Sequence, residues 1–331
     1  MENFRSIFEQ FNHLNIMVVG DIMIDRYLSG KVTRISPEAP VPVVALESRE
    51  NRLGGAANVA LNIKALGANP ILISVVGNDN EGAIFKKILP ENGISSDFLH
   101  TSNSRKTTVK TRVLAASQQL LRVDAEDTHS LSGEETKELK SIISNQLDSK
   151  KVDAILLQDY NKGVLTQELI EFVIKEAQKR QIPTAVDPKK DNFWAYKGVT
   201  LFKPNLKEIR ESMEKPVQTN SESLLLAGKH IRHILSNTFS MITLSEKGVF
   251  YDEENQSGII PTIPRSIADV SGAGDTVISV ATLGLACNLD IRTIAILSNL
   301  AGGQVCEKVG VVPVDKKLLL EEALELLVQK A

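Results

Sequence analysis

A chain of 331 residues with a formal net charge of −3 and a pI near 6.0 excludes general attraction to nucleic acid or to an anionic membrane. Its apolar runs stop well short of about 18 residues, and the first ten residues carry neither a basic region nor an apolar core, which predicts a cytoplasmic protein without a membrane segment. The two cysteines and five histidines show no metal-ligand spacing, so buried thiols are expected rather than a disulfide or a metal site.

The first strand is predicted at residues 15–20, where a short apolar run, NIMVVG, follows an amphipathic opening helix. Asp21 follows this strand directly and Asp25 comes four residues later. Ligands of open α/β sheets bind at the carboxyl ends of strands, so both acids are candidates for holding sugar hydroxyl groups. The alternative for each is a turn aspartate that caps local backbone N–H groups.

Residues 26–48 change to an alternating pattern broken by Pro37, Pro40 and Pro42, which is typical of edge strands or a flap. Residues 107–125 predict two further strands of a hairpin. Together these strands predict a small sheet set apart from the main body, able to cover a site as a lid. An open sheet face needs a partner to bury it, which favours a homodimer through the lid strands.

Between the lid strands, Gly54 and Gly55 precede Asn58 at the start of a predicted helix. Paired glycines permit close approach of the backbone to a ligand, and an asparagine offers a donor and acceptors to a polyol. Packing is the alternative reason for such a glycine pair.

Strands then alternate with helices, which predicts an α/β protein with a mostly parallel sheet and helices on both faces. Helices are expected at residues 81–92, 167–180 and 291–307. The strands are expected at residues 70–76, 154–158, 183–186, 201–203, 239–244 and 259–264.

The stretch Asp269–Asp275, DVSGAGD, opens a helix of small and apolar residues. Small residues at a helix start leave its first N–H groups approachable, and with the helix dipole they form an anion site. Asp275 in the first turn could face a bound phosphate and take a proton from an attacking hydroxyl group. The alternative is an ordinary strand-to-helix turn with an aspartate near the N-cap.

The glycine-rich stretch at 54–60 and the stretch at 269–275, about 215 residues apart, together resemble the ribokinase-like (PfkB) family of carbohydrate kinases. Residues 205–208, NLKE, match the family's NxxE. The resemblance covers the whole chain, 1–331, as one kinase domain. It implies a ribokinase-like fold with a mostly parallel central sheet, helices on both faces and a small β-sheet lid.

Within that family, residues 20–27, 36–43 and 121–126 resemble the D-glycero-β-D-manno-heptose-7-phosphate kinase branch. This resemblance implies ATP-dependent phosphorylation of the anomeric O1 to the 1,7-bisphosphate, on the way to lipopolysaccharide core heptose. Some relatives carry a fused nucleotidyltransferase domain, but the chain contains no HxGH, so kinase activity alone is expected.

The resemblance also implies roles for individual residues in phosphoryl transfer. Asp275 is the expected base, and Gly272, Ala273 and Gly274 supply N–H groups to the transferred phosphoryl group. Asn205 and Glu208 are expected to position Mg²⁺ through water, although their spacing fits a helix capping box equally well.

Substrate and nucleotide contacts follow from the same resemblance. Asp21, Asp25, Gly54, Gly55 and Asn58 form the expected sugar-contacting set. The substrate's own phosphate needs a cationic clamp, for which the candidates are Lys110, Arg112, Arg122 and Lys189; solvated surface side chains are the alternative. The nucleotide is expected against Thr243, Ser245, Gly248, Gly272, Gly274, Asn299 and Gly303.

Ser271 and Ser245 depart from the family, since Thr and Gly respectively are common there. Asp269 and the turn 308–310 could bind a monovalent cation such as K⁺. The rival functions are a kinase of another sugar or sugar phosphate and a non-catalytic sugar-phosphate sensor on the same fold. A dinucleotide-dependent oxidoreductase is disfavoured because no GxGxxG follows the first strand.

Overall fold

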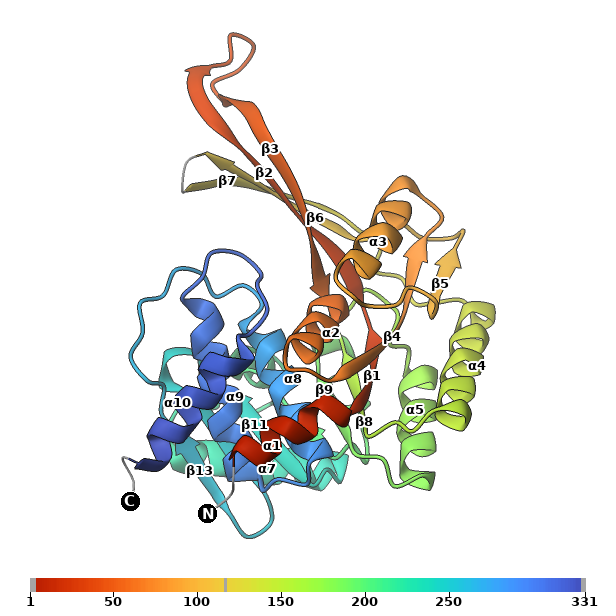
Figure 1. The fold of residues 1–331 in the computed structure, drawn as a ribbon, viewed down its shortest axis with the longest axis vertical. Helices are drawn as coiled ribbons and strands as arrows, with labels where there is room; N and C mark the ends of the chain where they lie inside the picture. The colour runs from red at the N-terminus through yellow and green to blue at the C-terminus, as the bar shows by residue number, and fades with distance from the viewer. Residues whose placement is uncertain (1–3, 116–117, 329–331) are drawn as a thin grey trace.

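The computed structural model describes residues 4–115 and 118–328. The expected 1–331 domain and the expected 107–125 lid stretch each include a few residues outside these ranges. A nine-stranded sheet forms the centre of the body (Figure 1). Its order is β13-β12-β11-β10-β9-β8-β1-β4-β5, parallel from β11 to β5 and antiparallel at β12 and β13. The strands are β1 Asn15–Gly20, β4 Asn69–Gly77, β5 Leu99–Ser102, β8 Ala154–Gln158, β9 Thr184–Asp187, β10 Leu201–Phe202, β11 Phe239–Thr243, β12 Val249–Asp252 and β13 Ser257–Ile260.

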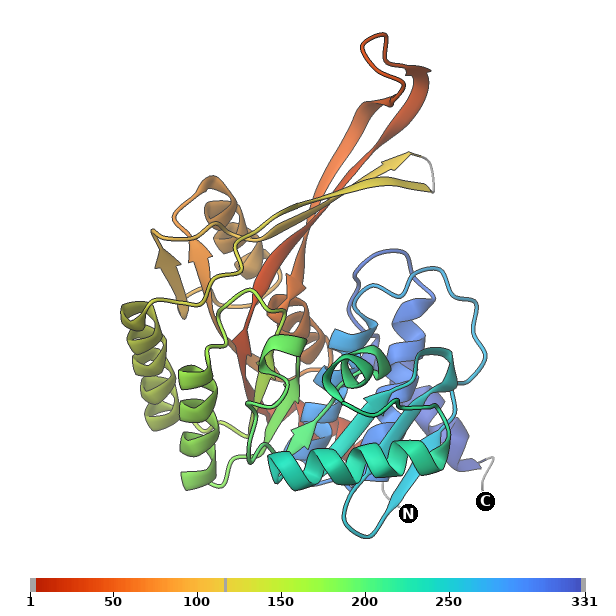
Figure 2. The same cartoon turned by 180° about the vertical axis from the view of Figure 1, so that it is seen from behind.

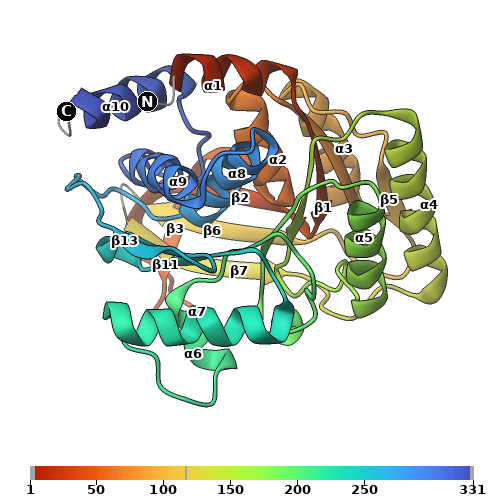
Figure 3. The same cartoon turned by 90° about the horizontal axis from the view of Figure 1, so that it is seen from below.

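Helices cover both faces of this sheet, as Figure 3 shows from below. One face carries α1 Phe4–Gln10, α2 Ala56–Ala65, α3 Asn80–Glu91, α8 Ala273–Ala286, α9 Ile291–Cys306 and α10 Lys316–Val328. The other face carries α4 Gly133–Ser149, α5 Gln167–Lys179, α6 Leu206–Ser212 and α7 Ser221–Leu235. Short 3₁₀ helices lie at Phe11–His13, Lys190–Asn192 and Ser245–Lys247.

Strand β1 shows why the run at 15–20 is apolar on both sides. Ile16 and Val18 enter the core beneath α2 and α8, whereas Met17 and Val19 enter the core beneath α4 and α5. Successive side chains of a strand point to opposite faces, so a central strand with helices on both faces is apolar throughout. The expected α/β class with a mostly parallel sheet is confirmed.

A second sheet rises from the body as a long twisted arm (Figures 1 and 2). Its order is β3-β2-β6-β7, with β2 Ile22–Ile35, β3 Pro42–Gly55, β6 Val109–Ala115 and β7 Gln118–Ala125. The expected small sheet is therefore confirmed, and β2 and β3 are longer than the pattern predicted. Only Asp21 separates β1 from β2, so the arm is a direct continuation of the central strand.

The strand predicted at 259–264 is wrong for its last four residues, because β13 ends at Ile260. Pro261 and Pro264 lack the N–H donor that a ladder requires, and β13 pairs only along the length of β12. Within the described residues, no helix is both long and apolar enough to cross a bilayer.

Candidate active site

Helix α8 begins at a glycine cap that leaves its amino end open. Gly272 has φ +81°, a left-handed conformation that favours glycine, and no side chain caps the first turn. The first intrahelical bond runs from Thr276 N–H to the Gly272 carbonyl at 3.0 Å. The N–H groups of Gly274 and Asp275 therefore precede the helical bonding pattern, as in other helix-terminal anion sites.

Asp275 lies in that first turn, only 4% exposed, and three side chains donate to its carboxylate. Asn58 Nδ2 lies 2.8 Å from Oδ2, while Tyr160 Oη lies 2.6 Å and Gln158 Nε2 3.2 Å from Oδ1. These donors come from α2, from β8 and from the loop that follows β8. Segments separated by more than 100 residues in sequence thus meet at one carboxylate.

Burial raises the pKa of Asp275 to about 6, with the bonds from Tyr160 and Asn58 acting in the opposite direction. A second buried carboxylate, Asp187 at the end of β9, adds to the rise and forms an ion pair with Lys203 at 3.0 Å. A carboxylate with such a pKa is ionised at neutral pH and still basic enough to accept a proton, as a general base requires.

Asp21, predicted to hold sugar, points into the structure instead of standing free at the strand end. It is 1% exposed, and its carboxylate accepts from the N–H groups of Tyr160 (2.8 Å), Lys162 (3.1 Å) and Val164 (3.1 Å). Burial and then the neighbouring Asp159 raise its pKa to about 6. Asp21 therefore caps backbone N–H groups, but they belong to the loop after β8, 139 to 143 residues further along the chain, and not to a local turn as the alternative supposed.

Gly54 and Gly55 are the last residues of β3 and pack against Asp25 and Asp21, respectively. A Cβ atom at Gly54 would collide with the Asp25 carboxylate, and Gly55 has φ +60° with the Asp21 carbonyl beside it. Close packing therefore already requires both glycines. Asn58, in the first turn of α2, is fully buried and donates to Asp275, which places it beside the candidate base.

The second sheet presents a charged face to the body. Lys110 and Arg112 alternate along β6 and lie opposite Asp124 and Arg122 of β7, so all four side chains share one face. On the same face Arg112 pairs with Asp25, and Lys110 Nζ lies 3.0 Å from both Asp124 and Glu126. The structure thus brings three of the four predicted phosphate-binding cations together.

The face makes direct contact with the body at Tyr27 and Arg52. The N–H of Val311 donates to the Tyr27 hydroxyl at 3.4 Å, and Arg52 donates to the carbonyls of Val309 and Val311 at 3.4 and 3.3 Å. The side bearing the cations is therefore the side turned toward α8.

Lys189, the fourth cation, lies apart from the sheet and pairs with Glu208. Glu208 also forms a capping box with Asn205: its Oε2 accepts from Asn205 N at 2.8 Å, and its N–H donates to Asn205 Oδ1 at 2.9 Å. The capping-box alternative is thus what the structure shows for α6. Among the described residues, no three His, Cys, Asp or Glu side chains gather as a metal site. A divalent ion here would take most of its ligands from phosphates and water.

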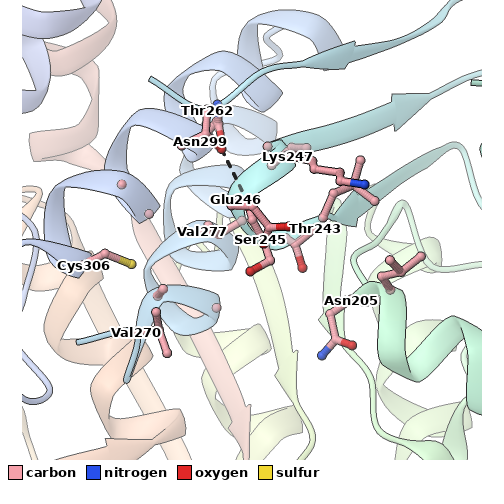
Figure 4. Close-up of a pocket in the computed structure, with 18 of the residues that line it drawn as sticks. Asn205, Thr243, Ser245, Glu246, Lys247, Thr262, Val270, Val277, Asn299 and Cys306 are labelled. Carbon is pink, nitrogen blue, oxygen red and sulfur yellow. Dashed lines mark hydrogen bonds between the residues drawn. The ribbon is translucent and has the colours of Figure 1, made fainter. Parts of the chain in front are cut away.

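A cavity of about 1100 Å³ lies beside the α8 terminus, large enough for a nucleotide (Figure 4). Asn205, Thr243 and Ser245 line one side, and Val270, Val277, Asn299 and Cys306 lie opposite. Gly248, Ala273, Gly274 and Gly303 complete its wall. The structure therefore gathers six of the seven predicted nucleotide residues around one cavity, which reaches the start of α8; the seventh, Gly272, does not line it.

Ser245 adopts φ +57°, a conformation that glycine favours and other residues rarely take. A glycine, which the family resemblance leads us to expect here, would adopt this conformation without strain. The Ser245 carbonyl accepts from Thr262 Oγ1 at 3.5 Å, the contact dashed in Figure 4. Asn299 donates to the Pro261 carbonyl at 2.9 Å, so its amide also fixes the 261–264 segment.

Asp269 and the 308–310 turn, predicted to share a cation site, do meet. The N–H of Gly310 donates to Asp269 Oδ2 at 2.9 Å and the N–H of Ser271 to Oδ1 at 2.9 Å. The two loops flank the beginning of α8.

Comparison with known proteins decides the family. Residues 13–317 match the family described as pfkB family carbohydrate kinase. The chain belongs to the pfkB family. Two curated relatives, both called bifunctional protein HldE, come from Methylobacillus flagellatus and Geobacter sulfurreducens. Their sequences are 41% and 39% identical to this chain over an alignment that covers 93% of it. The same alignments cover 62% and 63% of the two relatives. The chain thus spans about three-fifths of the relatives it matches.

Solved structures show the ribokinase-like fold for this pfkB family member. Escherichia coli phosphofructokinase-2 in complex with potassium is 19% identical, with a TM-score of 0.77 over 95% of this chain and 99% of that one. Arabidopsis thaliana ribokinase complexed with ribose and ATP is 16% identical, with a TM-score of 0.71 over 94% of this chain and 98% of that one.

Sequence reasoning assigned no role to Tyr160, Gln158 or Lys203 in this pfkB family protein. All three follow or end a strand at the same edge of the sheet, so the strand-end rule was the available signal. That rule identifies positions and not partners, because which strands are neighbours depends on the sheet order.

Proposed function

We propose that this chain transfers the γ-phosphoryl group of ATP to the anomeric O1 of D-glycero-β-D-manno-heptose 7-phosphate, giving the 1,7-bisphosphate used for lipopolysaccharide core heptose. The observation that carries the proposal is Asp275, buried in the first turn of α8 beside a nucleotide-sized cavity. Membership of a carbohydrate kinase family and the sequence runs at 20–27, 36–43 and 121–126 support the substrate.

Asp275 takes the proton of the O1 hydroxyl as that oxygen attacks the γ-phosphorus and ADP leaves. The pKa of about 6 keeps the carboxylate ionised at neutral pH. Of the three expected backbone donors, the N–H groups of Gly272 and Gly274 are left to face the charge that develops on the transferred group, because the Ala273 N–H already donates to the Val270 carbonyl at 3.3 Å.

The nucleotide lies in the cavity against Thr243, Ser245 and Gly248 on its phosphate side, and against Asn299 and Gly303 on the other. Asn205 and Glu208 would hold Mg²⁺ through water, since the capping box leaves Asn205 at the cavity wall. When bound, Mg²⁺ supplies charge neutralisation of the β- and γ-phosphates.

The 7-phosphate binds the charged face of the second sheet, at Lys110, Arg112 and Arg122, with Lys189 nearer the transfer site. These cations already pair with Asp124, Glu126, Asp25 and Glu208, so the incoming phosphate exchanges one set of charged hydrogen bonds for another. Asp25 and the backbone at Gly54 and Gly55 lie beside the sugar.

A monovalent cation such as K⁺ would lie between Asp269 and the 308–310 turn. The contact of Asp269 with Gly310 supports this placement. A homodimer would form through the face of the second sheet that is turned away from the body. Leu121 and Val123 alternate on β7 and are 56% and 50% exposed, which leaves an apolar surface to bury. A single sedimentation species at the mass of a monomer would contradict this assembly.

The function is tested by coupling ADP release to a spectroscopic readout with five acceptors: the heptose 7-phosphate, fructose 6-phosphate, fructose 1-phosphate, tagatose 6-phosphate and ribose. The expected kcat/KM is highest for the heptose 7-phosphate. Faster turnover of another acceptor would reassign the substrate within the family. Binding of the heptose phosphate without turnover of any acceptor would favour a sensor.

A further inference from the structure

The loop 159–163 after β8 aims a tyrosine at the candidate base. Tyr160 Oη donates to Asp275 Oδ1 at 2.6 Å, and Gln158 Nε2 approaches the same oxygen at 3.2 Å. The other oxygen, Oδ2, accepts only from Asn58 among the described side chains, at 2.8 Å. Two donors thus engage Oδ1, whereas Oδ2 keeps room for another proton donor.

The central strand fixes this loop in place. Asp21, which directly follows β1, accepts from the backbone N–H groups of Tyr160, Lys162 and Val164. On its other side, Lys189 Nζ lies 5.5 Å from the centre of the Tyr160 ring. A nearly buried carboxylate therefore fixes the backbone that carries the phenol, as suits a group that orients another side chain.

We propose that Tyr160 is a positioning residue for phosphoryl transfer: its hydroxyl holds Oδ1 of Asp275, so that Oδ2 faces the acceptor hydroxyl and takes its proton. This inference rests on the proposed role of Asp275 as base. As the new O–P bond forms, the sugar O–H bond breaks and its proton moves to Oδ2, while ADP departs with the electrons of the broken P–O bond. Tyr160 keeps its own proton throughout.

The hydrogen bond from Tyr160 to Asp275 should affect the pH dependence of the rate, because it is one of several interactions that set the pKa of Asp275. Asp187 at the end of β9, Lys203 after β10 and Lys189 beyond Asp187 supply the other charges facing it. The Tyr160 hydrogen bond favours the ionised carboxylate, so its loss raises the pKa of Asp275 and moves the acid limb of the rate to higher pH. Burial and the Asp275 charge raise the pKa of Tyr160 well above its usual value, which keeps the phenol a donor.

The test compares Tyr160→Phe with Tyr196→Phe, using Mg·ATP and whichever acceptor turns over fastest in the wild type. Tyr196 is a matched control, because its hydroxyl donates at the same 2.6 Å to a buried carboxylate, that of Asp159, which does not contact Asp275. In Tyr160→Phe we expect the acid limb of kcat to rise by about one pH unit, the shift that loss of one charge-assisted hydrogen bond produces. We expect kcat near pH 6 to fall about fivefold, with both KM values within about threefold of wild type.

Tyr196→Phe should lower the melting temperature without moving the acid limb. The substrate's own phosphate also titrates near pH 6, but it is common to all variants and cancels in the comparison. An unmoved limb in Tyr160→Phe, or an equal shift in both variants, would overturn the proposal.

Should Tyr160→Phe fail to fold, 3-fluorotyrosine at position 160 replaces it. This more acidic phenol is a stronger donor, so the acid limb should move to lower pH; an unchanged limb would contradict the proposal. Asp275→Asn separates the two ideas. Retained turnover in Asp275→Asn refutes the proposed base itself, whereas lost turnover together with a wild-type profile for Tyr160→Phe refutes only the positioning role.

Discussion

The two ends of the proposed substrate site are built in different ways. At the transfer end, Asp275 is 4% exposed and is fixed by donors from α2, β8 and the following loop. At the recognition end, Arg122 lies on an extended arm with its side chain 49% exposed, and the cations there are paired with acids of the same sheet. In the proposed reaction, transfer would use a preorganised group in the body, whereas recognition would use exchangeable ion pairs.

The largest expected effect follows from removing the base at the transfer end. Asp275→Asn should lower kcat by about 10³-fold, because a positioned general base contributes roughly 10²–10⁴-fold. The asparagine keeps the shape of the side chain, so ATP affinity by calorimetry should stay near that of wild type. Turnover within tenfold of wild type would mean that another group takes the proton.

At the recognition end the loss should appear in KM instead. Lys110→Ala should raise KM for the sugar phosphate about tenfold or more and leave kcat within about threefold, since one charged hydrogen bond is worth about 1.5–3 kcal/mol. Lys31→Ala is the matched control: Lys31 lies on β2 of the same sheet, in an exposed ion pair with Glu47. Equal effects of the two substitutions would refute a specific phosphate site.

The raised pKa of Asp275 predicts how the stability of the protein depends on pH. The pKa of Asp275 is raised in the folded state, so its contribution to stability is fully present below about pH 4 and is lost as the pH rises through about 6. Relative to wild type, Asp275→Asn should therefore gain unfolding free energy as the pH rises from about 4 to about 7, by at most about 3 kcal/mol for a shift of about two units.

Glu135 should change the stability in the opposite direction, because its pKa is lowered in the folded protein. Its carboxylate caps α4 and accepts from Ser102, and these hydrogen bonds outweigh the opposing effect of burial and lower its pKa to about 2. That stability is present above about pH 4.5 and is lost as the pH falls through about 2, so Glu135→Gln should destabilise at pH 7. Chemical denaturation of both variants across pH checks the pair; a common sign would contradict the assignment.

The smallest expected effect lies between the two ends, at the α6 cap. Asn205→Ala removes one half of the capping box and should cost about 1 kcal/mol of stability. It should also raise KM for Mg·ATP a few-fold, because the side chain lines the cavity. A loss of stability with an unchanged KM for ATP would restrict Asn205 to its structural role.

The same contrast explains how far the sequence alone could lead. Apolar and alternating patterns predicted the β1 and β8 strands, the two strands within 107–125 and an edge or flap stretch at 26–48, because burial on both faces and edge-strand prolines leave local marks. They did not divide the 26–48 stretch into β2 and β3. The end of β13 at Ile260 was missed, since its length is set by its partner β12.

Site residues divide in the same way. Asp275 was predicted because the DVSGAGD stretch carries its own helix start. Tyr160 was not, because its contact with Asp275 spans 115 residues and depends on the order of the strands. Asp21 was predicted at a strand end, yet its burial and its three N–H donors follow from a loop that no local pattern places beside it.

The central claim is tested most directly by identifying the product. Wild-type protein and Asp275→Asn are each incubated with Mg·ATP and D-glycero-β-D-manno-heptose 7-phosphate, and the product is followed by ³¹P and ¹H NMR. We expect a second sugar phosphate signal coupled to the anomeric proton, with ADP formed in equal amount, and no such signal from Asp275→Asn. A new phosphate on any other carbon, or no transfer by the wild type, would contradict the proposed reaction.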